Sequence, residues 1–430
     1  MIYFYKIIAI KMPTKIHRNR LFFWLAISII SGVACKPYIQ VSSENIASTY
    51  SDDFVSFLQV SDITHLNDSQ SIFTFNLATE NFLYQREKQN EPFVASVTVR
   101  LLIFDSFNTD KWSDSSSLHL IFEKPGNELN KDYSLLFKAK TGNEYALLIS
   151  VTDNHKNIKQ NFIFNVDKSN NTNAEWFIGS ASVKKTGTFR SCHPGDTIDF
   201  RYLGMRPDFL KCYYYNDSFS IPSPPFSYEN STSLKLKEDS VITVSKSDTG
   251  FWFITDKEGI YFVSSDENMQ SGYTIIAIDG GFPEIESHRD MLGPIRYITS
   301  QKEYLRIAQS ENMAAAIEDF WLKLGSHEEL ARNLIKKYYT RVVIANKLFS
   351  SYTEGWKSDR GMIYIVFGPP NIVYRGSEQE SWIYGEENNF FSITFTFEKL
   401  KNKFSNNDYF LQRTPVYKDN WYRAVDIWRQ

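Results

Sequence analysis

Short apolar runs separated by polar residues fill the first two thirds of the chain, and they restrict its fold most. Between residues 53 and 168, seven such runs follow one another. In several of them every second residue is apolar, as at Phe73, Phe75 and Leu77, which is the period of a strand with one buried face. The aromatic content of 16% suits sheets packed face to face. We therefore predict an immunoglobulin-like β-sandwich over residues 53–168.

Residues 173–287 contain a second set of strand-like runs. Two breaks in this set, at residues 248–250 and 257–259, each include a glycine, which we expect to take the positive φ of a tight turn. The region is predicted to be a second β-rich domain, either a sandwich of its own or a large extension of the first.

The pattern changes to a helical period near residue 300. Residues 300–325 and 326–349 predict two helices that form an αα-hairpin, with a break in the first near Gln309. Strand-like runs then return, at 361–368, 371–376, 380–385 and 390–399. We predict a small antiparallel sheet covered by the helices, an α+β module over residues 300–430. The fold class is thus mainly β, with tandem sandwich domains and an α+β C-terminal module.

Residues 1–35 read as an export signal. A basic stretch, "KMPTKIHRNR", precedes the apolar run "LFFWLAISIISGVAC", which is short for a membrane span of about 20 residues. Met12 is a second candidate for the start of translation. "SGVAC" resembles a bacterial lipobox, in which Cys35 would be lipidated, although Gly32 stands where leucine is usual. An ordinary cleaved signal and a retained helix are the alternatives.

The residues after Cys35 are typical of a segment that connects a lipid anchor to a folded domain. Residues 36–52 are polar and serine-rich, as in a flexible tether. Lysine at position 36 favours sorting to the outer membrane. We expect an exported protein that is lipid-anchored to the cell envelope.

The remaining cysteines and the charge restrict the partners. Cys192 and Cys212 can form a disulfide in an oxidising compartment if their strands are neighbours, or they can be two buried free thiols. The sequence has no C-x-x-C spacing and no His/Cys cluster, so we expect no metal site and no cofactor. The net charge of -3 does not favour nucleic acid as a partner.

The loop "SSYTEGWKSDRG", residues 350–361, concentrates glycine, tryptophan and charged residues before an apolar run. One interpretation is a buried brace that joins the helices to the sheet. A second is a groove for a peptide or glycan, and a third is a catalytic site with Asp359 or Glu354 as acid/base. The candidate binding residues are Trp356, Ser358, Asp359, Arg360, Trp382 and Tyr384, with the last two expected to pack over Trp356. We predict no catalytic residue, since no zinc-protease, nucleophile-elbow or phosphate-loop motif is present.

The segments "GWKSDRG", "MIYIVFGPPN" and "ESWIY" together resemble the GWxTD-domain family of bacterial envelope proteins. Ser358 replaces the threonine of the family signature and keeps a hydroxyl group. The similarity covers residues 301–430. It implies an exported lipoprotein with β-rich regions before the named domain, and it implies no particular activity. We therefore expect a non-catalytic binding or assembly role with another envelope protein or a glycan, with a periplasmic hydrolase as the alternative.

Overall fold

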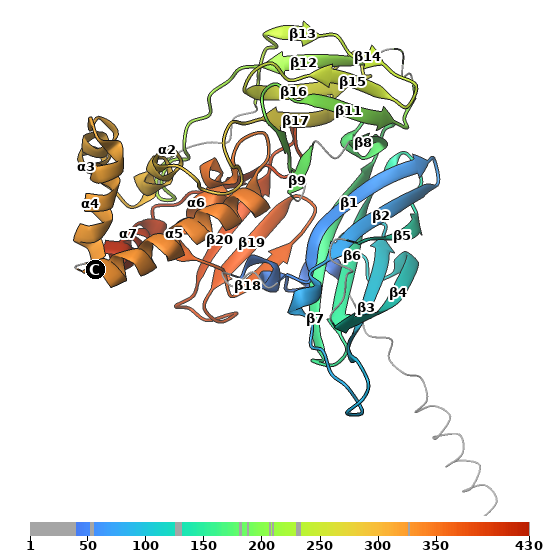
Figure 1. Ribbon diagram of the computed structural model, residues 1–430, viewed down its shortest axis with the longest axis horizontal. Coiled ribbons are helices and arrows are strands. Elements are labelled where there is room, and N and C mark those ends of the chain that lie inside the picture. Colours follow the sequence, from blue (N-terminus) through green and yellow to red (C-terminus); the bar gives the residue numbers. More distant parts are fainter. Residues whose placement is uncertain are drawn as a thin grey trace, which may run out of the picture. The chain divides into compact units, whose positions relative to one another are not determined.

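Figure 1 shows the computed structural model of the chain, which describes residues 40–51, 56–124, 131–179, 183–186, 189–205, 208, 210–228, 234–325 and 327–429. The predicted signal peptide, with Cys35, lies outside the described residues. The same holds for residues 36–39 and 52 of the predicted tether.

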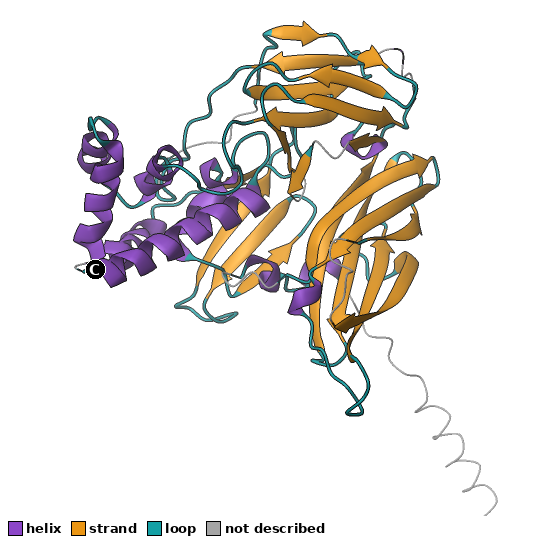
Figure 2. Ribbon diagram, viewed as in Figure 1, coloured by secondary structure: helices purple, strands orange, loops and turns teal. Residues whose placement is uncertain are grey.

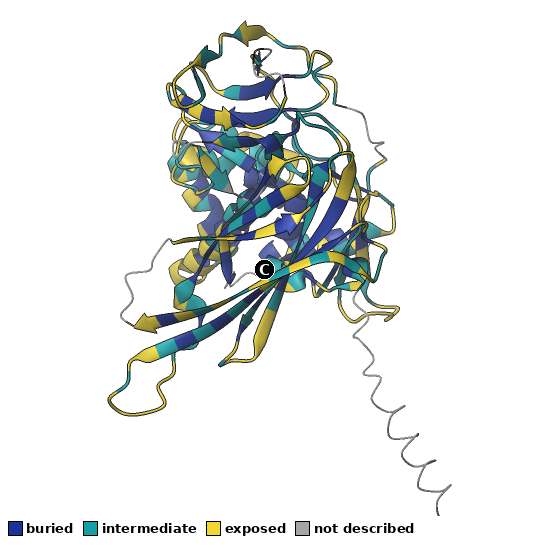
Figure 3. Cartoon of the chain, turned by 90° about the vertical axis from the view of Figure 1, so that its right-hand side faces the viewer, coloured by how far each residue is buried: buried dark blue, intermediate teal, exposed yellow. Residues whose placement is uncertain are grey.

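The first β region consists of two antiparallel sheets. One has the order β1-β2-β5, with β1 at Leu58–Asn67, β2 at Gln70–Leu77 and β5 at Asp132–Lys138. The other has the order β4-β3-β6-β7, with β3 at Phe93–Phe104, β4 at Trp112–Lys124, β6 at Asn143–Asp153 and β7 at Ile158–Lys168. Alternate side chains, such as Val97 and Val99, are buried in the core between the sheets. Figure 3 colours the chain by burial, and buried and more exposed residues alternate along several strands.

This arrangement confirms a sandwich and adds a detail of its topology. The fourth strand pairs with the third, whereas in a constant-type immunoglobulin domain it pairs with the fifth. The turn between β6 and β7 is a hairpin, in which Asn157 takes a φ of 54°.

The second β region also has two sheets. The larger has the order β13-β12-β16-β17-β10-β9, with β9 at Lys184–Thr186, β10 at Phe189–Cys192, β12 at Lys211–Tyr215, β13 at Ser240–Ile242, β16 at Gly259–Ser264 and β17 at Tyr273–Ala277. The smaller has the order β14-β15-β11-β8, with β8 at Phe177–Gly179, β11 at Thr197–Tyr202, β14 at Ser245–Lys246 and β15 at Phe251–Ile254. Their inward side chains form one aromatic-rich core.

The two glycine turns of this region differ from each other. Gly259 takes a φ of 141°, as we predicted, but the φ of Gly250 is not positive. A Cβ at Gly250 would instead overlap the carbonyl oxygen of Phe200 on the neighbouring strand β11. Close approach of two backbones, rather than turn geometry, therefore requires glycine at position 250.

The structure separates Cys192 and Cys212, which are free, buried thiols. Cys192 ends β10 and Cys212 lies in β12, and the two strands are not neighbours because β16 and β17 lie between them. Three strand spacings are about 14 Å, whereas a disulfide needs Cα atoms within about 7 Å. Of the two alternatives, the structure has the free thiols.

We expect both thiols to be unreactive until the protein unfolds. Burial raises the pKa of Cys192 to about 11 and that of Cys212 further, which suppresses the thiolate. In a Cys35→Ser variant, dithionitrobenzoate should detect no thiol in the native protein and two after denaturation. A melting temperature that drops when a reductant is added would contradict this assignment.

The C-terminal module combines helices with a four-stranded antiparallel sheet. The helices are α2 at His288–Leu292, α3 at Gln301–Ala308, α4 at Met313–Gly325, α5 at Glu328–Phe349, α6 at Asp359–Phe367 and α7 at Tyr417–Arg429. The sheet has the order β18-β19-β20-β21, at Ile372–Arg375, Gln379–Tyr384, Ile393–Lys399 and Tyr409–Leu411. The helices α5 and α6 lie over one face of the sheet (Figure 2). Phe349 and Tyr364 of these helices contact Trp382 of the sheet.

The helices of this module agree with one expectation and differ from another. The break of the first helix near Gln309 is confirmed, since Gln309 is the C-cap of α3. The strand predicted at 361–368 is wrong, because these residues belong to the helix α6. Every residue of Asp359–Val366 is buried, so the run has no polar face, and an entirely apolar run does not distinguish a strand from a helix.

Candidate functional site

The loop before α6 is packed tightly against α5. The 3-10 helix η7, at Gly355–Lys357, contacts α5, and a Cβ at Gly355 would overlap the carbonyl oxygen of Ala345. The φ of Gly355 is not positive, so glycine is needed here for close approach and not for a left-handed turn. The N–H of Gly355 donates to the hydroxyl of Ser350 at 2.7 Å. The loop is therefore part of the interior of the module.

Ser358 is the N-cap of α6. Its Oγ accepts a hydrogen bond from the N–H of Gly361 at 3.0 Å and donates to the carbonyl oxygen of Gly355 at 2.7 Å. Both bonds need a hydroxyl group, which serine and the threonine of the family signature share.

We expect Ser358→Ala to lower the free energy of unfolding by about 1 kcal/mol, since it removes the cap. Ser358→Thr keeps the hydroxyl and should stay within a few tenths of a kcal/mol of the wild type. Denaturant unfolding of both variants measures the difference. Equal stability of the alanine and threonine variants would contradict a capping role.

Asp359 forms a buried ion pair at the start of α6. Its carboxylate accepts hydrogen bonds from both terminal nitrogens of Arg413, at 2.5 and 3.1 Å, and from the N–H of Leu411 at 2.7 Å. The side chains of Asp359 and Arg413 are 6% and 2% exposed. This pair connects α6 to the end of β21, and the position in the first turn also suits a carboxylate.

Arg360, in α6, is 1% exposed and contacts residues of the sheet. Its guanidinium group donates to the carbonyl and side-chain oxygens of Asn407, at 2.9 and 2.6 Å, and stacks 4.1 Å from the centre of the Tyr409 ring. It also lies 3.5 Å from the carboxylate of Glu380.

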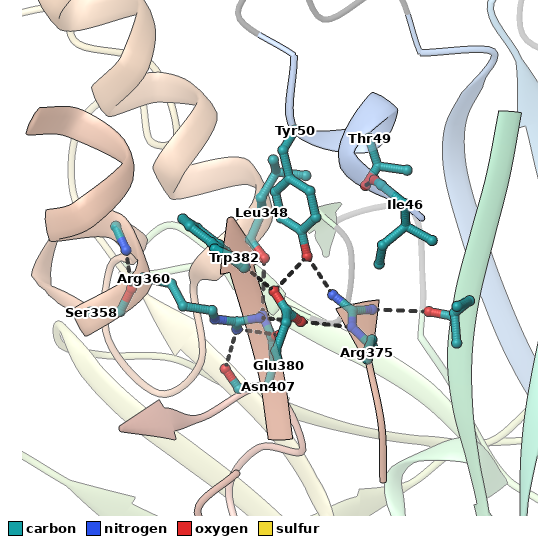
Figure 4. A network of polar contacts seen from close by, with 12 residues as sticks. Ile46, Thr49, Tyr50, Leu348, Ser358, Arg360, Arg375, Glu380, Trp382 and Asn407 are labelled. Atoms are coloured by element: carbon teal, nitrogen blue, oxygen red, sulfur yellow. Dashed lines mark hydrogen bonds and ion pairs between the residues drawn. The ribbon is translucent and has the colours of Figure 1, made fainter. Parts of the chain in front are cut away.

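Glu380 is the centre of this buried network, which Figure 4 shows. It is 0% exposed and accepts hydrogen bonds from Tyr50 at 2.9 Å, from Trp382 at 2.7 Å and from Arg375 at 2.7 Å, in addition to Arg360. Burial alone would raise the pKa of Glu380. The two guanidinium groups and the Trp382 N–H outweigh burial and lower the pKa to about 2. Glu380 is therefore a buried carboxylate that stays ionised.

Arg375 and Tyr50 extend this network to other parts of the chain. Arg375 donates to the hydroxyl of Tyr50 at 2.6 Å and to the carbonyl oxygen of Ile163, in β7 of the first sandwich, at 3.0 Å. The hydroxyl of Tyr364 in α6 donates to the carbonyl oxygen of Tyr50 at 2.8 Å. The buried ion pairs thus join the N-terminal segment, the sandwich and the C-terminal module.

Residues 40–51, expected to be a solvated tether, are packed against the C-terminal module. Val41, Ile46 and Tyr50 are buried. The N–H of Ile46 donates to the carbonyl oxygen of Val373 in β18 at 3.0 Å, and the N–H of Val373 donates to the side chain of Asn45 at 3.0 Å. These three buried side chains are separated by polar residues, so the average composition of the segment is polar. This is why the sequence suggested a tether.

The six candidate binding residues do not form one surface. Asp359, Arg360 and Trp382 are buried, whereas Trp356, Ser358 and Tyr384 are partly exposed. Trp356 packs beside Tyr297, not beneath Trp382 or Tyr384 as expected. Tyr384 instead contacts Phe367 and donates to the carbonyl oxygen of Gly368 at 2.8 Å.

The carboxylates of the hydrolase alternative both have structural partners. Asp359 is held by Arg413, and Glu354 is paired with Lys357 at 2.8 Å. The geometry of this loop therefore corresponds to the interpretation of a brace.

Sequence reasoning missed Glu380, Arg375 and Tyr50 as parts of this site. One signal was available for Glu380. It lies two positions before Trp382 on the same strand, so the two side chains share a face of the sheet. A large apolar side chain such as Trp382 indicates that this face is buried, and a carboxylate on a buried face is unusual.

These features define a β-rich protein whose C-terminal α+β module is locked by the loop "GWKSDRG" and a buried carboxylate. The family model of the GWxTD domain matches residues 259–430, so this part of the chain is a GWxTD domain. The match includes β16 and β17 of the second β region. A search of curated proteins found no match to the chain. Within the described ranges, no helix is long and apolar enough to cross a membrane.

Proposed function

We propose that this protein is an exported component of a bacterial envelope, anchored by a lipid on Cys35, with a non-catalytic binding or assembly role. The outer membrane is the proposed location, on the basis of Lys36, and the proposed partner is another envelope protein or a glycan. The GWxTD domain supports this proposal through the family resemblance.

The single observation that carries the proposal is the packing of residues 40–51 on the GWxTD domain. Six residue steps separate Cys35 from the buried Val41, and an extended chain of this length spans about 20 Å at most. A lipid on Cys35 would hold the domain close to the membrane surface instead of at the end of a long tether. Such a position suits assembly with a component embedded in the same membrane.

Metabolic labelling with an alkyne fatty acid tests the anchor. We expect the wild type and a Cys192→Ser control to take up the label and to sediment with membranes, and a Cys35→Ser variant to do neither. A Cys35→Ser variant that keeps the label would exclude lipidation at this residue.

Cross-linking and affinity capture from intact membranes test the assembly role. A variant with about ten Gly/Ser residues inserted after Lys36 should remain folded and lipidated, because the insertion lies before the packed segment. We expect the wild type to capture envelope proteins and the insertion variant to capture none of them. Identical capture by both would contradict a role that depends on distance from the membrane.

A further inference from the structure

A cavity of about 320 Å³ lies among the first sandwich, the second β region and the GWxTD domain. Figure 4 shows part of its lining, including Ile46, Thr49 and Arg375. Cavities between domains are frequent sites for small ligands, and this volume is at the small end of their range. The cavity therefore suits a small molecule and excludes a folded partner.

Most charged side chains of the lining already have partners inside the protein. The pairs are Lys185 with Asp62, Arg375 with Glu380, Lys347 with Glu284, and Lys403 with the hydroxyl of Tyr215. Asp167 accepts a hydrogen bond from the hydroxyl of Ser169, and Arg190 lies over the ring of Tyr273. In the part of the chain that the structure describes, two further charged lining residues have no salt bridge. These are Glu175, in the 3-10 helix η4 at Ala174–Trp176, and Lys399, at the end of β20. A carboxylate and an ammonium group are thus left for a ligand.

The surroundings of Glu175 favour a ligand that donates hydrogen bonds and carries positive charge. Burial and the nearby Asp167 raise the pKa of Glu175 to about 7, although Arg190 partly offsets them. Asn173, which also lines the cavity, is 5% exposed, and its Oδ1 has no hydrogen-bond partner. A buried acceptor without a donor is costly, so a ligand ammonium group placed here would satisfy both side chains.

Lys399 favours a negatively charged group on the ligand. Burial lowers its pKa by more than the nearby Glu144, Glu378 and Asp167 raise it, so its charged form is only partly stabilised by the protein. A ligand carboxylate beside it would restore that stabilisation. Glu175 and Lys399 line the same cavity of about 320 Å³, so one small ligand can contact both. Phe162 and Phe164 of β7, both partly exposed, provide an apolar wall in the same cavity.

We propose that this cavity binds a short peptide with free termini, whose ammonium group lies at Glu175 and Asn173 and whose carboxylate lies at Lys399. The apolar wall of Phe162 and Phe164 accommodates a side chain of the peptide. This inference goes beyond the proposed membrane role and does not depend on lipidation of Cys35.

Isothermal titration calorimetry with the purified full-length protein tests the proposal. The probes are free tripeptides with alanine, phenylalanine or lysine at the centre, the same tripeptides acetylated and amidated at their ends, and diacetylchitobiose. At least one free tripeptide should bind with a Kd of about 1 mM or tighter, and its blocked form should bind at least about tenfold more weakly. Equal binding of the blocked form, binding of the saccharide alone, or no binding of any free tripeptide would overturn the proposal.

Variants locate the binding in this cavity. Ser377 is an exposed lining residue in the turn between β18 and β19, so Ser377→Trp should fill the cavity and abolish binding without loss of fold. Ser115→Trp, at an exposed position of β4 outside the lining, is the matched control and should bind as the wild type does. Glu175→Gln and Lys399→Met should each weaken binding about tenfold, by roughly 1.4 kcal/mol. Unchanged binding by a folded Ser377→Trp variant would refute the assignment.

Discussion

Glu380→Gln is expected to lower the free energy of unfolding by about 3–5 kcal/mol, the usual cost of breaking a buried ion pair from one side. The variant leaves the buried guanidinium group of Arg360 and the partly exposed one of Arg375 without this counter-charge. The amide nitrogen would also face these N–H donors in place of a carboxylate oxygen. Denaturant unfolding with a probe in the C-terminal module, such as the fluorescence of the buried Trp382, measures the loss.

Glu378→Gln is the matched control for this change. Glu378 lies two residues earlier, is 61% exposed, and is 3.6 Å from Lys401 at the surface. Its replacement should change stability by no more than about 0.5 kcal/mol. If Glu380→Gln were as mild as this control, the buried network would not be what holds the module together.

The contribution of Glu380 should also depend on pH. Its pKa in the folded protein is lowered to about 2 from an ordinary value of 4.5. A group whose folded pKa is lowered stabilises the protein fully above the unfolded pKa, and loses this effect as the pH falls through the folded pKa. The stability difference between wild type and Glu380→Gln should therefore be constant near neutrality and shrink between about pH 4.5 and pH 2. A difference that grows in this range would contradict the assigned charge state.

Asp359→Asn is expected to have a comparable effect, about 3–5 kcal/mol, through a different ion pair. The variant removes the charge that Arg413 faces, and Arg413 is 2% exposed at that contact. An amide can accept only part of the hydrogen bonding that the carboxylate receives from Arg413 and from the Leu411 N–H. Thermal and denaturant unfolding would measure the change.

Glu354→Gln controls for the presence of a carboxylate in the same loop. Glu354 is 25% exposed and pairs with Lys357 near the surface, so its replacement should cost about 1 kcal/mol or less. A folded Asp359→Asn variant with wild-type stability that loses a binding partner would support a ligand groove at this loop instead of a brace.

The local pattern of the sequence was sufficient for much of the architecture. Strand-like runs, several of them with a period of two in the first region, predicted the strands of both β regions. The helical period after residue 300 predicted the hairpin of α4 and α5. The errors fall where the local pattern is ambiguous. The buried run of α6 has no polar face, and the three-residue strand β21 is too short to show a period.

The spatial arrangement of the candidate binding residues could not be predicted from the local sequence. The motif around Trp356 and Asp359 was visible in the sequence, but it did not reveal that Trp356 and Trp382 lie apart. Nor did it reveal that residues 40–51 pack on the GWxTD domain, because three buried side chains in a polar segment leave the average composition unchanged.

The sequence by itself determined the mainly β fold class, the helix pair and the GWxTD motif, because each depends on residues that are close together in the chain. Only the tertiary structure decided that Glu380 is the centre of a buried network. Tyr50 and Glu380, which share a hydrogen bond, are 330 residues apart in the chain. Contacts over such a separation follow from how the sheets and helices pack, and no local period of the sequence records them.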